Sequence, residues 1–138
     1  MAIRYRIQPK KSPRDHSVKY YGVQHVRQMN ANQFVENIVQ KNTVTRADVL
    51  AVLASVKEEL VNCFRNGNSV TLGEIGTFRV TMKTKGALTR DKFTKDNIKQ
   101  LLVRFLPSPT FKNDVRVGHP YINFIDMDKE LNPEDEGE

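Results

Sequence analysis

The middle of the chain carries apolar side chains at intervals of three and four residues, which is the pattern of an amphipathic helix. The apolar positions are Val49, Val52, Leu53, Val56, Leu60, Cys63 and Phe64. Thr45 and Asp48 form a Thr-x-x-Asp capping pair before them, and Asn66-Gly67 suits the left-handed residue that ends many helices. The pattern therefore predicts a long helix between these two signals.

A shorter apolar stripe precedes this helix. Its members are Phe34, Val35, Ile38 and Val39. Asn30 or Asn32 can cap a helix that runs through about Lys41, and Thr43-Val44 provides the turn into the next one. The two stripes together predict a pair of helices.

Alternation with a period of two follows the helix pair and predicts strands. Val70 and Leu72 share one face of a short first strand. On a second strand Phe78, Val80 and Met82 lie on one face, and Arg79, Thr81 and Lys83 lie on the other. A third strand runs from Ile98 to Leu106 and ends at prolines. We expect a three-stranded antiparallel sheet.

Both ends of the chain lie outside this helix-and-sheet region, which we place at residues 30–117. Residues 1–29 form a basic extension with two short strands, at residues 3–7 and 18–27, and a polar loop at residues 8–15. After residue 117 we expect a strand near residues 121–125 and then a disordered acidic tail. A short helix is expected at residues 110–115.

The net charge of +6 is unevenly distributed. The segment from Asp126 to Glu138 carries a charge of −6, so the rest of the chain carries +12. A body this basic indicates a polyanionic partner, most simply nucleic acid, although a basic protein can also owe its charge to solubility alone. The segment Lys83–Asn97 has five Lys or Arg residues and no apolar periodicity, so we expect it to extend as a basic β-ribbon arm.

Several other classes of protein are disfavoured. The single cysteine, Cys63, allows no disulfide within the chain and lies on the apolar stripe, so it is expected in the core rather than as a nucleophile. The three histidines are far apart and have no partners at metal-binding spacing. No apolar run reaches membrane-spanning length, and the first residues lack a secretory signal. We therefore expect a cytoplasmic protein with no enzymatic activity, cofactor, metal, membrane or small-molecule substrate.

The predicted unit is small for its apolar content. Fewer than about 80 residues form the helix pair and the sheet, which is marginal for an independent core. An intertwined homodimer would bury the stripe of the long helix and place two arms side by side as a clamp. We therefore expect a homodimer.

Two motifs carry a family resemblance. The run Glu74-Ile75-Gly76-Thr77-Phe78 is similar to the Gly-hydrophobic-Gly-Thr-Phe turn of the HU/IHF family of bacterial histone-like DNA-binding proteins, and Phe105 with Pro107 matches the Phe-x-Pro that follows the arm in that family. The likeness covers residues from about 30 to 112. Lys19-Tyr20-Tyr21 resembles a motif in the extended HU-related proteins of Bacteroidetes.

The resemblance implies an α+β fold, an HU/IHF-like intertwined dimer with a helix pair, a three-stranded antiparallel sheet and a β-ribbon arm at about residues 81–103. It also implies a nucleoid-associated architectural protein that condenses double-stranded DNA without sequence specificity. The candidate phosphate contacts are Arg79, Lys83, Lys85, Arg90, Lys92, Lys95, Lys99, Arg104, Lys112 and Arg116. The alternatives are an RNA or mixed nucleic-acid binder, and a dimeric structural or protein-interaction module.

The arm departs from the family at its tip. Family arms typically carry a proline that wedges between base pairs, and residues 86–97 contain none. Leu88 and Phe93 are the bulky apolar residues of this segment, and Phe93 is the better candidate wedge. Its alternative role is to pack the two ribbon strands together. We therefore expect weaker DNA bending than in typical members.

Overall fold

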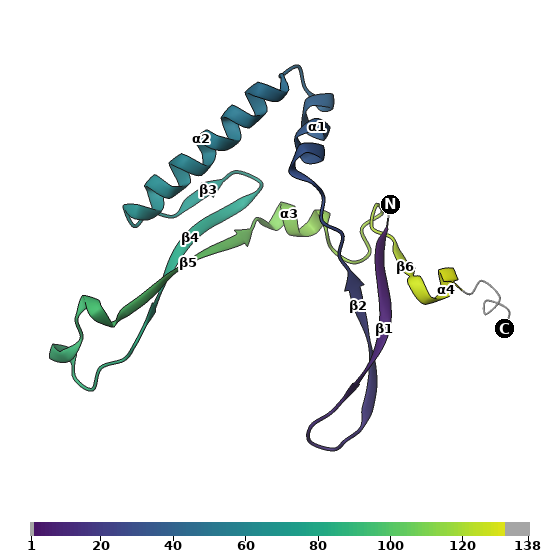
Figure 1. The fold of residues 1–138 in the computed structure, drawn as a ribbon, viewed down its shortest axis with the longest axis horizontal. Coiled ribbons are helices and arrows are strands. Elements are labelled where there is room, and N and C mark those ends of the chain that lie inside the picture. Colours follow the sequence, from purple (N-terminus) through teal and green to yellow (C-terminus); the bar gives the residue numbers. More distant parts are fainter. Residues whose placement is uncertain (1, 132–138) are drawn as a thin grey trace. The chain divides into compact units, whose positions relative to one another are not determined.

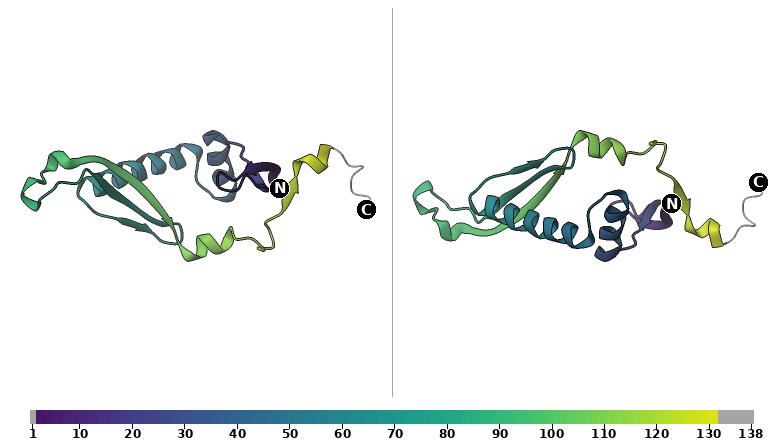
Figure 2. Two further views of the ribbon diagram at one scale, coloured as in Figure 1. Left: turned by 90° about the horizontal axis from the view of Figure 1, so that it is seen from below. Right: turned by 90° about the horizontal axis from the view of Figure 1, so that it is seen from above.

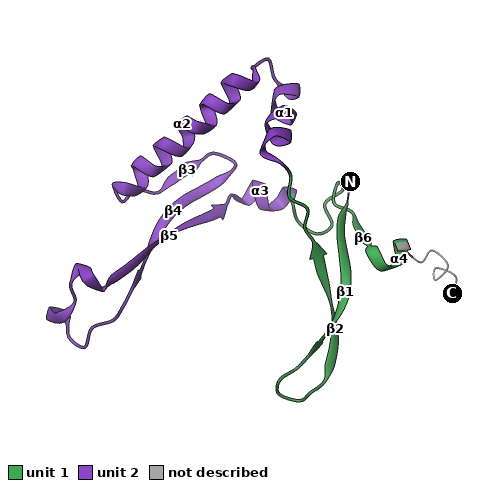
Figure 3. Ribbon diagram, in the orientation of Figure 1, with its two compact units in different colours: residues 1–29, 115–138 green, residues 30–114 purple. Residues whose placement is uncertain are grey.

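The computed structural model describes residues 2–131, and the chain folds into two compact units (Figures 1 and 3). One unit comprises residues 30–114, and the other joins residues 1–29 with residues 115–138. We call them the central unit and the terminal unit. No helix in the described part of the chain is both long enough and apolar enough to span a bilayer.

The central unit begins with the predicted helix pair, α1 (Ala31–Lys41) and α2 (Arg46–Arg65). The Asn30 side chain accepts a hydrogen bond from the Asn32 backbone N–H at 2.8 Å and caps α1. At the start of α2, the Asp48 N–H donates to Thr45 Oγ1 at 3.2 Å and the Thr45 N–H donates to Asp48 Oδ2 at 3.0 Å. The Thr45 hydroxyl also donates to Asp48 Oδ2 at 2.7 Å, and this bond, followed by the one from the Thr45 N–H, holds the pKa of the Asp48 carboxyl below its ordinary value. Both caps confirm the predicted helix starts.

An antiparallel sheet follows, in the order β3–β4–β5. Its strands are β3 (Val70–Leu72), β4 (Gly76–Thr84) and β5 (Ile98–Pro107). Helix α2 lies along this sheet, and the far end of β4 and β5 projects past it (Figure 2). The predicted three-stranded antiparallel sheet is confirmed.

The structure explains why the first residue of the Gly-Thr-Phe motif, Gly76, is a glycine. Its φ is +148°, a conformation that residues with a Cβ rarely adopt. A Cβ at this position would also overlap the Leu106 carbonyl oxygen and lie 2.9 Å from the ring of Phe105. Only glycine therefore allows β4 to start this close to the end of β5.

Ser108 joins the end of β5 to the β3–β4 turn through hydrogen bonds. Its N–H donates to the Ile75 carbonyl at 3.0 Å, and its hydroxyl donates to the Glu74 carbonyl. The hydroxyl also accepts from the Phe111 N–H at 3.1 Å, which caps the short helix α3 (Pro109–Asp114). The β3–β4 turn and the exit from β5 are thus tied together at the base of the ribbon.

The central unit buries very little by itself. Val35 and Val49, at 2% and 8% exposure, are the buried apolar side chains among the described residues. On α2 the apolar stripe stays open, with Val52 at 61% exposure and Val56 at 38%. A single chain therefore leaves most of the predicted core stripe uncovered.

The terminal unit contains a long β-hairpin and a strand from the other end of the chain. β1 (Ile3–Lys11) pairs antiparallel with β2 (Val18–His25), and its first residues pair parallel with β6 (Phe124–Asp126). A short helix, α4 (Met127–Leu131), follows β6.

Three expectations for the ends of the chain need correction. Residues 8–11, expected in a loop, continue β1; Pro9 is tolerated because β6 pairs only with residues 3–5, which leaves one edge of β1 open there. The last strand occupies residues 124–126 rather than 121–125. The start of the acidic tail, expected to be disordered, forms α4, and residues 132–138 lie outside the described residues.

Candidate nucleic-acid interface

The ribbon formed by β4 and β5 has two chemically different faces. One face carries the apolar cross-strand pairs Phe78–Phe105, Val80–Val103 and Met82–Leu101. The Phe78 and Phe105 rings lie 4.8 Å apart between centroids. The other face carries the pairs Arg79–Arg104, Thr81–Leu102 and Lys83–Gln100. The alternation predicted for β4 thus sorts the cations onto one side of the ribbon.

Arg79 and Arg104 are direct cross-strand partners. Like charges placed opposite one another destabilise a β-ladder. Neither guanidinium has an ion-pair partner within residues 2–131, and both residues are exposed. An external anion would relieve this repulsion, so the pair is a favourable position for a phosphate.

A β-bulge lies where the ribbon meets its tip. Lys83 pairs with Gln100 and Thr84 pairs with Ile98, which leaves Lys99 as an extra residue without a partner strand position. The Lys99 Nζ donates to the Asp96 carbonyl oxygen at 3.1 Å. The bulge therefore directs Lys99 toward the tip rather than along the ladder.

The tip itself is not a β-ribbon, which corrects the arm expected across Lys83–Asn97. The ladder ends at Thr84 and Ile98, and two 3-10 turns follow at Arg90–Lys92 and Lys95–Asn97. Asn97 closes the loop: its backbone carbonyl accepts from the Lys85 N–H at 2.7 Å, and its side-chain amide donates to the Lys85 carbonyl at 2.9 Å. Side-chain bonds to the backbone here replace the ladder.

Asn97 also organises the second turn and was absent from the predicted site. Its Oδ1 accepts from the Thr94 N–H at 3.0 Å, in the same geometry as a helix capping box. The spacing Thr94-x-x-Asn97 is the signal that a sequence reading could have used. Asn97 thereby positions the turn that carries Lys95 and closes the loop that carries Arg90 and Lys92.

Nine of the ten candidate phosphate contacts belong to the central unit, and Arg116 belongs to the terminal unit. Three groups account for the nine: Arg79, Lys83, Lys99 and Arg104 on the ribbon, Lys85, Arg90, Lys92 and Lys95 on the tip, and Lys112 on α3. All nine are exposed. The ribbon and its tip therefore form one continuous basic segment, with Lys112 beyond the base of the ribbon.

The candidate wedge residues also lie on the tip. Leu88 is 93% exposed and Phe93 is 43% exposed. Leu88 is the more freely projecting side chain of the two. Whether either enters DNA stays a prediction.

The described residues contain no cluster of three or more His, Cys, Asp or Glu side chains that could hold a metal ion. The ribbon and its tip carry eight exposed Lys and Arg side chains, whose positive charge suits the binding of anions.

Comparison with known proteins identifies the family to which this chain belongs. Residues 1–119 match the HU-HIG family, described as "HU domain fused to wHTH, Ig, or Glycine-rich motif". The chain is also 30% identical over 99 residues to integration host factor subunit alpha of Methylorubrum extorquens, across 69% of this chain and 88% of that protein. The chain belongs to the HU/IHF family. It is thereby a DNA-binding protein of the histone-like kind and not an enzyme.

Two solved structures share the HU/IHF fold with this chain. A putative bacterial DNA-binding protein from Bacteroides vulgatus has a TM-score of 0.57 at 13% identity, and the match covers 91% of this chain and 49% of that one. A cocrystal structure of Anabaena HU with DNA has a TM-score of 0.50 at 23% identity and covers 64% of this chain and 99% of that one. The expected α+β fold with a helix pair and an antiparallel sheet is confirmed.

Proposed function

We propose that this protein is an architectural protein of the bacterial nucleoid that binds double-stranded DNA as a homodimer, with little sequence preference. The observation that carries the proposal is the basic face of β4 and β5, where Arg79 and Arg104 lie opposite one another and have no acidic partner among residues 2–131. The exposed lysines of the tip extend this face. Exposed Lys and Arg side chains can neutralise the phosphates of a duplex.

The choice of DNA over RNA draws on the relatives. The Anabaena HU structure contains DNA, and integration host factor belongs to the same family. A β-ribbon fits a groove of B-DNA, whereas the deep, narrow major groove of A-form RNA does not admit side chains readily. Duplex DNA is therefore the partner that best fits a projecting two-stranded arm.

The homodimer follows from what the central unit leaves exposed. The stripe on α2 and the apolar face of β4 and β5 both remain open to solvent in one chain, with Leu53 at 42% exposure and Val103 at 67%. Exposed apolar surface of this extent marks an interaction site. A second copy would cover both surfaces and would set two arms on one duplex.

Weak sequence preference follows from the type of side chain on the basic face. Its contacts are lysines and arginines suited to phosphates, which fix position but carry no sequence information. If about six phosphates are neutralised, the logarithm of the binding constant should fall against the logarithm of salt concentration with a slope near −5. Binding of this kind suits a protein that coats the nucleoid.

A mobility-shift titration tests the proposal with duplex DNA, duplex RNA and heparin of similar charge. We expect the tightest binding to duplex DNA and a steep salt dependence. The double variant Arg79→Gln/Arg104→Gln should weaken DNA binding at least tenfold at low salt. The matched control Lys41→Gln/Lys57→Gln removes two cations from the helices and should leave binding within about twofold.

Three results would count against the proposal. Equal affinity for heparin and DNA would favour a general polyanion or protein-interaction module. Tighter binding to duplex RNA would favour the RNA alternative. A preference of about a thousandfold for one DNA sequence would contradict backbone recognition.

A further inference from the structure

The β1–β2 hairpin of the terminal unit also separates cations onto one face. Alternation along β1 places Arg4, Arg6, Gln8 and Lys10 on the same side. Their cross-strand partners on β2 are His25, Val23, Tyr21 and Lys19. The opposite side carries Ile3, Tyr5, Ile7 and Pro9. One face of this hairpin is therefore basic from its base to its outer end.

The outer end repeats the unusual charge pair of the β4–β5 ribbon. Lys10 and Lys19 are direct cross-strand partners, both exposed, and Lys11 is adjacent in sequence. Neither Lys10 nor Lys19 has an ion-pair partner within the described residues. Two like charges opposite one another cost stability, and an external anion removes that cost.

Asp15, the acidic residue nearest in sequence to these lysines, forms no ion pair with them within residues 2–131. Asp15 is the one acidic residue of residues 1–29. Its carboxylate accepts hydrogen bonds from the Ser17 hydroxyl at 2.8 Å and the Ser17 N–H at 3.1 Å. These bonds hold the turn between the strands, and they keep the pKa of Asp15 below its ordinary value. The carboxylate is thus committed to the turn.

A hollow runs along the same end of the hairpin. Its volume is about 540 Å³, and Lys10, Lys11, Lys19 and Tyr21 are among the residues that line it, together with Asp15, whose carboxylate is bonded to Ser17. Three ammonium groups and a phenol beside one concave surface suit a phosphate chain, because cations neutralise phosphates and aromatic side chains contact the sugar and base surfaces.

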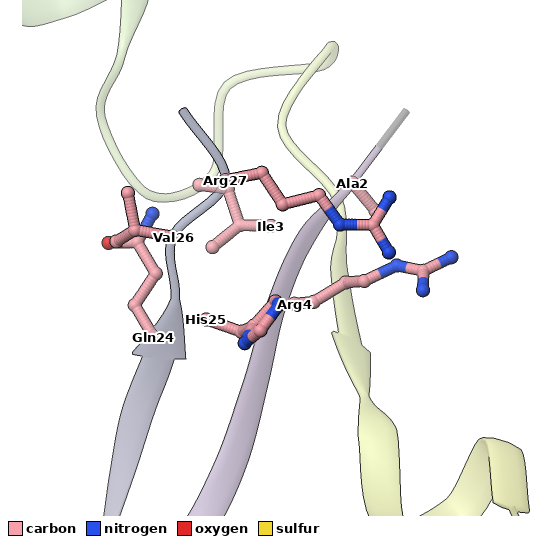
Figure 4. Close-up of a pocket in the computed structure, with 7 residues that line it drawn as sticks. All are labelled: Ala2, Ile3, Arg4, Gln24, His25, Val26 and Arg27. Carbon is pink, nitrogen blue, oxygen red and sulfur yellow. The ribbon is translucent and has the colours of Figure 1, made fainter. Parts of the chain in front are cut away.

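At the inner end of the basic face the arginines have acidic partners within the chain. Arg4 lies 3.6 Å from Glu130, and Arg6 lies 4.0 Å from Asp128, so α4 supplies carboxylates to both arginines. Figure 4 shows Arg4 and Arg27 extending in the same direction beside Ile3, at a hollow of about 380 Å³. The acids of α4 partly neutralise this end, which leaves the outer lysines as the free cations.

We propose that the outer half of the β1–β2 hairpin is a second contact with the DNA backbone, in which Lys10 and Lys19 bind phosphates and Lys11 and Arg14 add charge. The proposal rests on the proposed binding of double-stranded DNA. It adds a phosphate-binding site in the terminal unit, outside the helix pair and the β4–β5 arm.

The test compares salt dependence across three full-length proteins: wild type, Lys10→Gln/Lys19→Gln, and the control Lys41→Gln/Lys57→Gln. Loss of two phosphate contacts per chain should make the log–log salt slope shallower by about 2 per protomer and weaken binding roughly tenfold at low salt. The control pair should retain the wild-type slope. The thermal midpoint of Lys10→Gln/Lys19→Gln should not fall, because the substitution removes a repulsion rather than a contact.

The outcomes separate the two proposals. If Arg79→Gln/Arg104→Gln weakens binding but Lys10→Gln/Lys19→Gln matches wild type in slope and affinity, the second contact is overturned and the proposed function stands. If wild type fails to bind duplex DNA, both are overturned. A shallower salt slope for Lys10→Gln/Lys19→Gln, with the slope of the control Lys41→Gln/Lys57→Gln unchanged, supports the second contact.

A proximity measurement distinguishes direct contact with DNA from a long-range effect of the charge. Pro13→Cys, in a Cys63→Ala background, carries an iron chelate at the outer end of the hairpin and should cleave bound duplex more strongly than free chelate does. The same chelate on Ala54→Cys of α2 is the control. Cleavage from position 13 no stronger than from free chelate would overturn the second contact.

Discussion

The two antiparallel ribbons of this protein are built alike but supported differently. Each places a pair of like cations directly across its strands, Arg79–Arg104 in one and Lys10–Lys19 in the other. The β4–β5 ribbon is held at its base by Gly76 and Ser108, and its reverse face is an aromatic surface open to solvent. The β1–β2 ribbon is instead held by a strand and a helix from the far end of its own chain.

This difference shows where each ribbon obtains its stability. The base of β1 and β2 gains its third strand, β6, within one chain. Within residues 2–131, α2 and Phe111 of α3, whose ring lies 6.1 Å from that of Phe105, cover the apolar reverse face of β4 and β5 only in part, and Val103 and Leu101 stay exposed. We therefore expect the β4–β5 ribbon to depend on a second copy of the chain and the β1–β2 ribbon to depend on the C-terminal segment of its own chain.

The largest effect should come from a charge in the stripe of α2. Val56→Asp costs little in an isolated chain, where the side chain is 38% exposed, but in a dimer it buries an unpaired carboxylate. We expect the free energy of unfolding to fall by several kcal/mol and the protein to unfold rather than form a folded monomer. Circular dichroism and sedimentation measure both quantities.

The control for this variant is Ala54→Asp, which places the same charge on the other side of α2 and should leave the dimer intact. A Val56→Asp protein that folds cooperatively as a monomer at micromolar concentration would contradict the need for a second copy.

The next effect concerns the base of the β4–β5 ribbon. Gly76→Ala adds a Cβ that overlaps the Leu106 carbonyl and forces an unfavourable φ. We expect a loss of about 3 kcal/mol or more in the free energy of unfolding, measured by denaturant titration. Gly86→Ala is the matched control, because nothing lies within 4 Å of its Cβ. Equal stability of the two variants would show that Gly76 does not hold the ribbon.

A moderate effect is expected on DNA shape. Without a proline at the tip, the arm should bend DNA less than typical HU/IHF proteins, as measured by energy transfer between the ends of a labelled duplex. Phe93→Ala and Leu88→Ala, compared in the same assay, separate the two apolar side chains of the tip. Strong bending by wild type that disappears in Phe93→Ala, with affinity for straight duplex retained, would identify Phe93 as a wedge and contradict weak bending.

The smallest effect should come from the acids of α4. Glu130 and Asp128 lie beside Arg4 and Arg6 of the terminal unit, where their carboxylates can compete with phosphates for these two cations. Asp128→Asn/Glu130→Gln should tighten DNA binding about two- to threefold at low salt and leave it unchanged at high salt, where screening removes the competition. No change in affinity at low salt would assign these acids to solubility alone.

Much of the central unit could be predicted from the sequence because its signals are local. The Thr45–Asp48 capping box, the end of α2 at Asn66-Gly67 and the alternation along β4 each depend on residues within a few positions of one another. The candidate cations of the ribbon were found for the same reason, since alternation assigns them to one face. Only Arg116 is separated from them, in the terminal unit.

The sequence by itself determined the helix pair, the antiparallel sheet and the basic character of the arm. Tertiary structure alone decided that β6 pairs with the start of β1, that α4 places its carboxylates on Arg4 and Arg6, and that the Asn97 side chain donates to the Lys85 carbonyl and closes the arm tip. Periodicity and capping follow from the geometry of neighbouring residues, whereas these contacts join residues distant in sequence or substitute side-chain bonds for a ladder. Their partners are therefore selected by the folded chain and not by any local pattern.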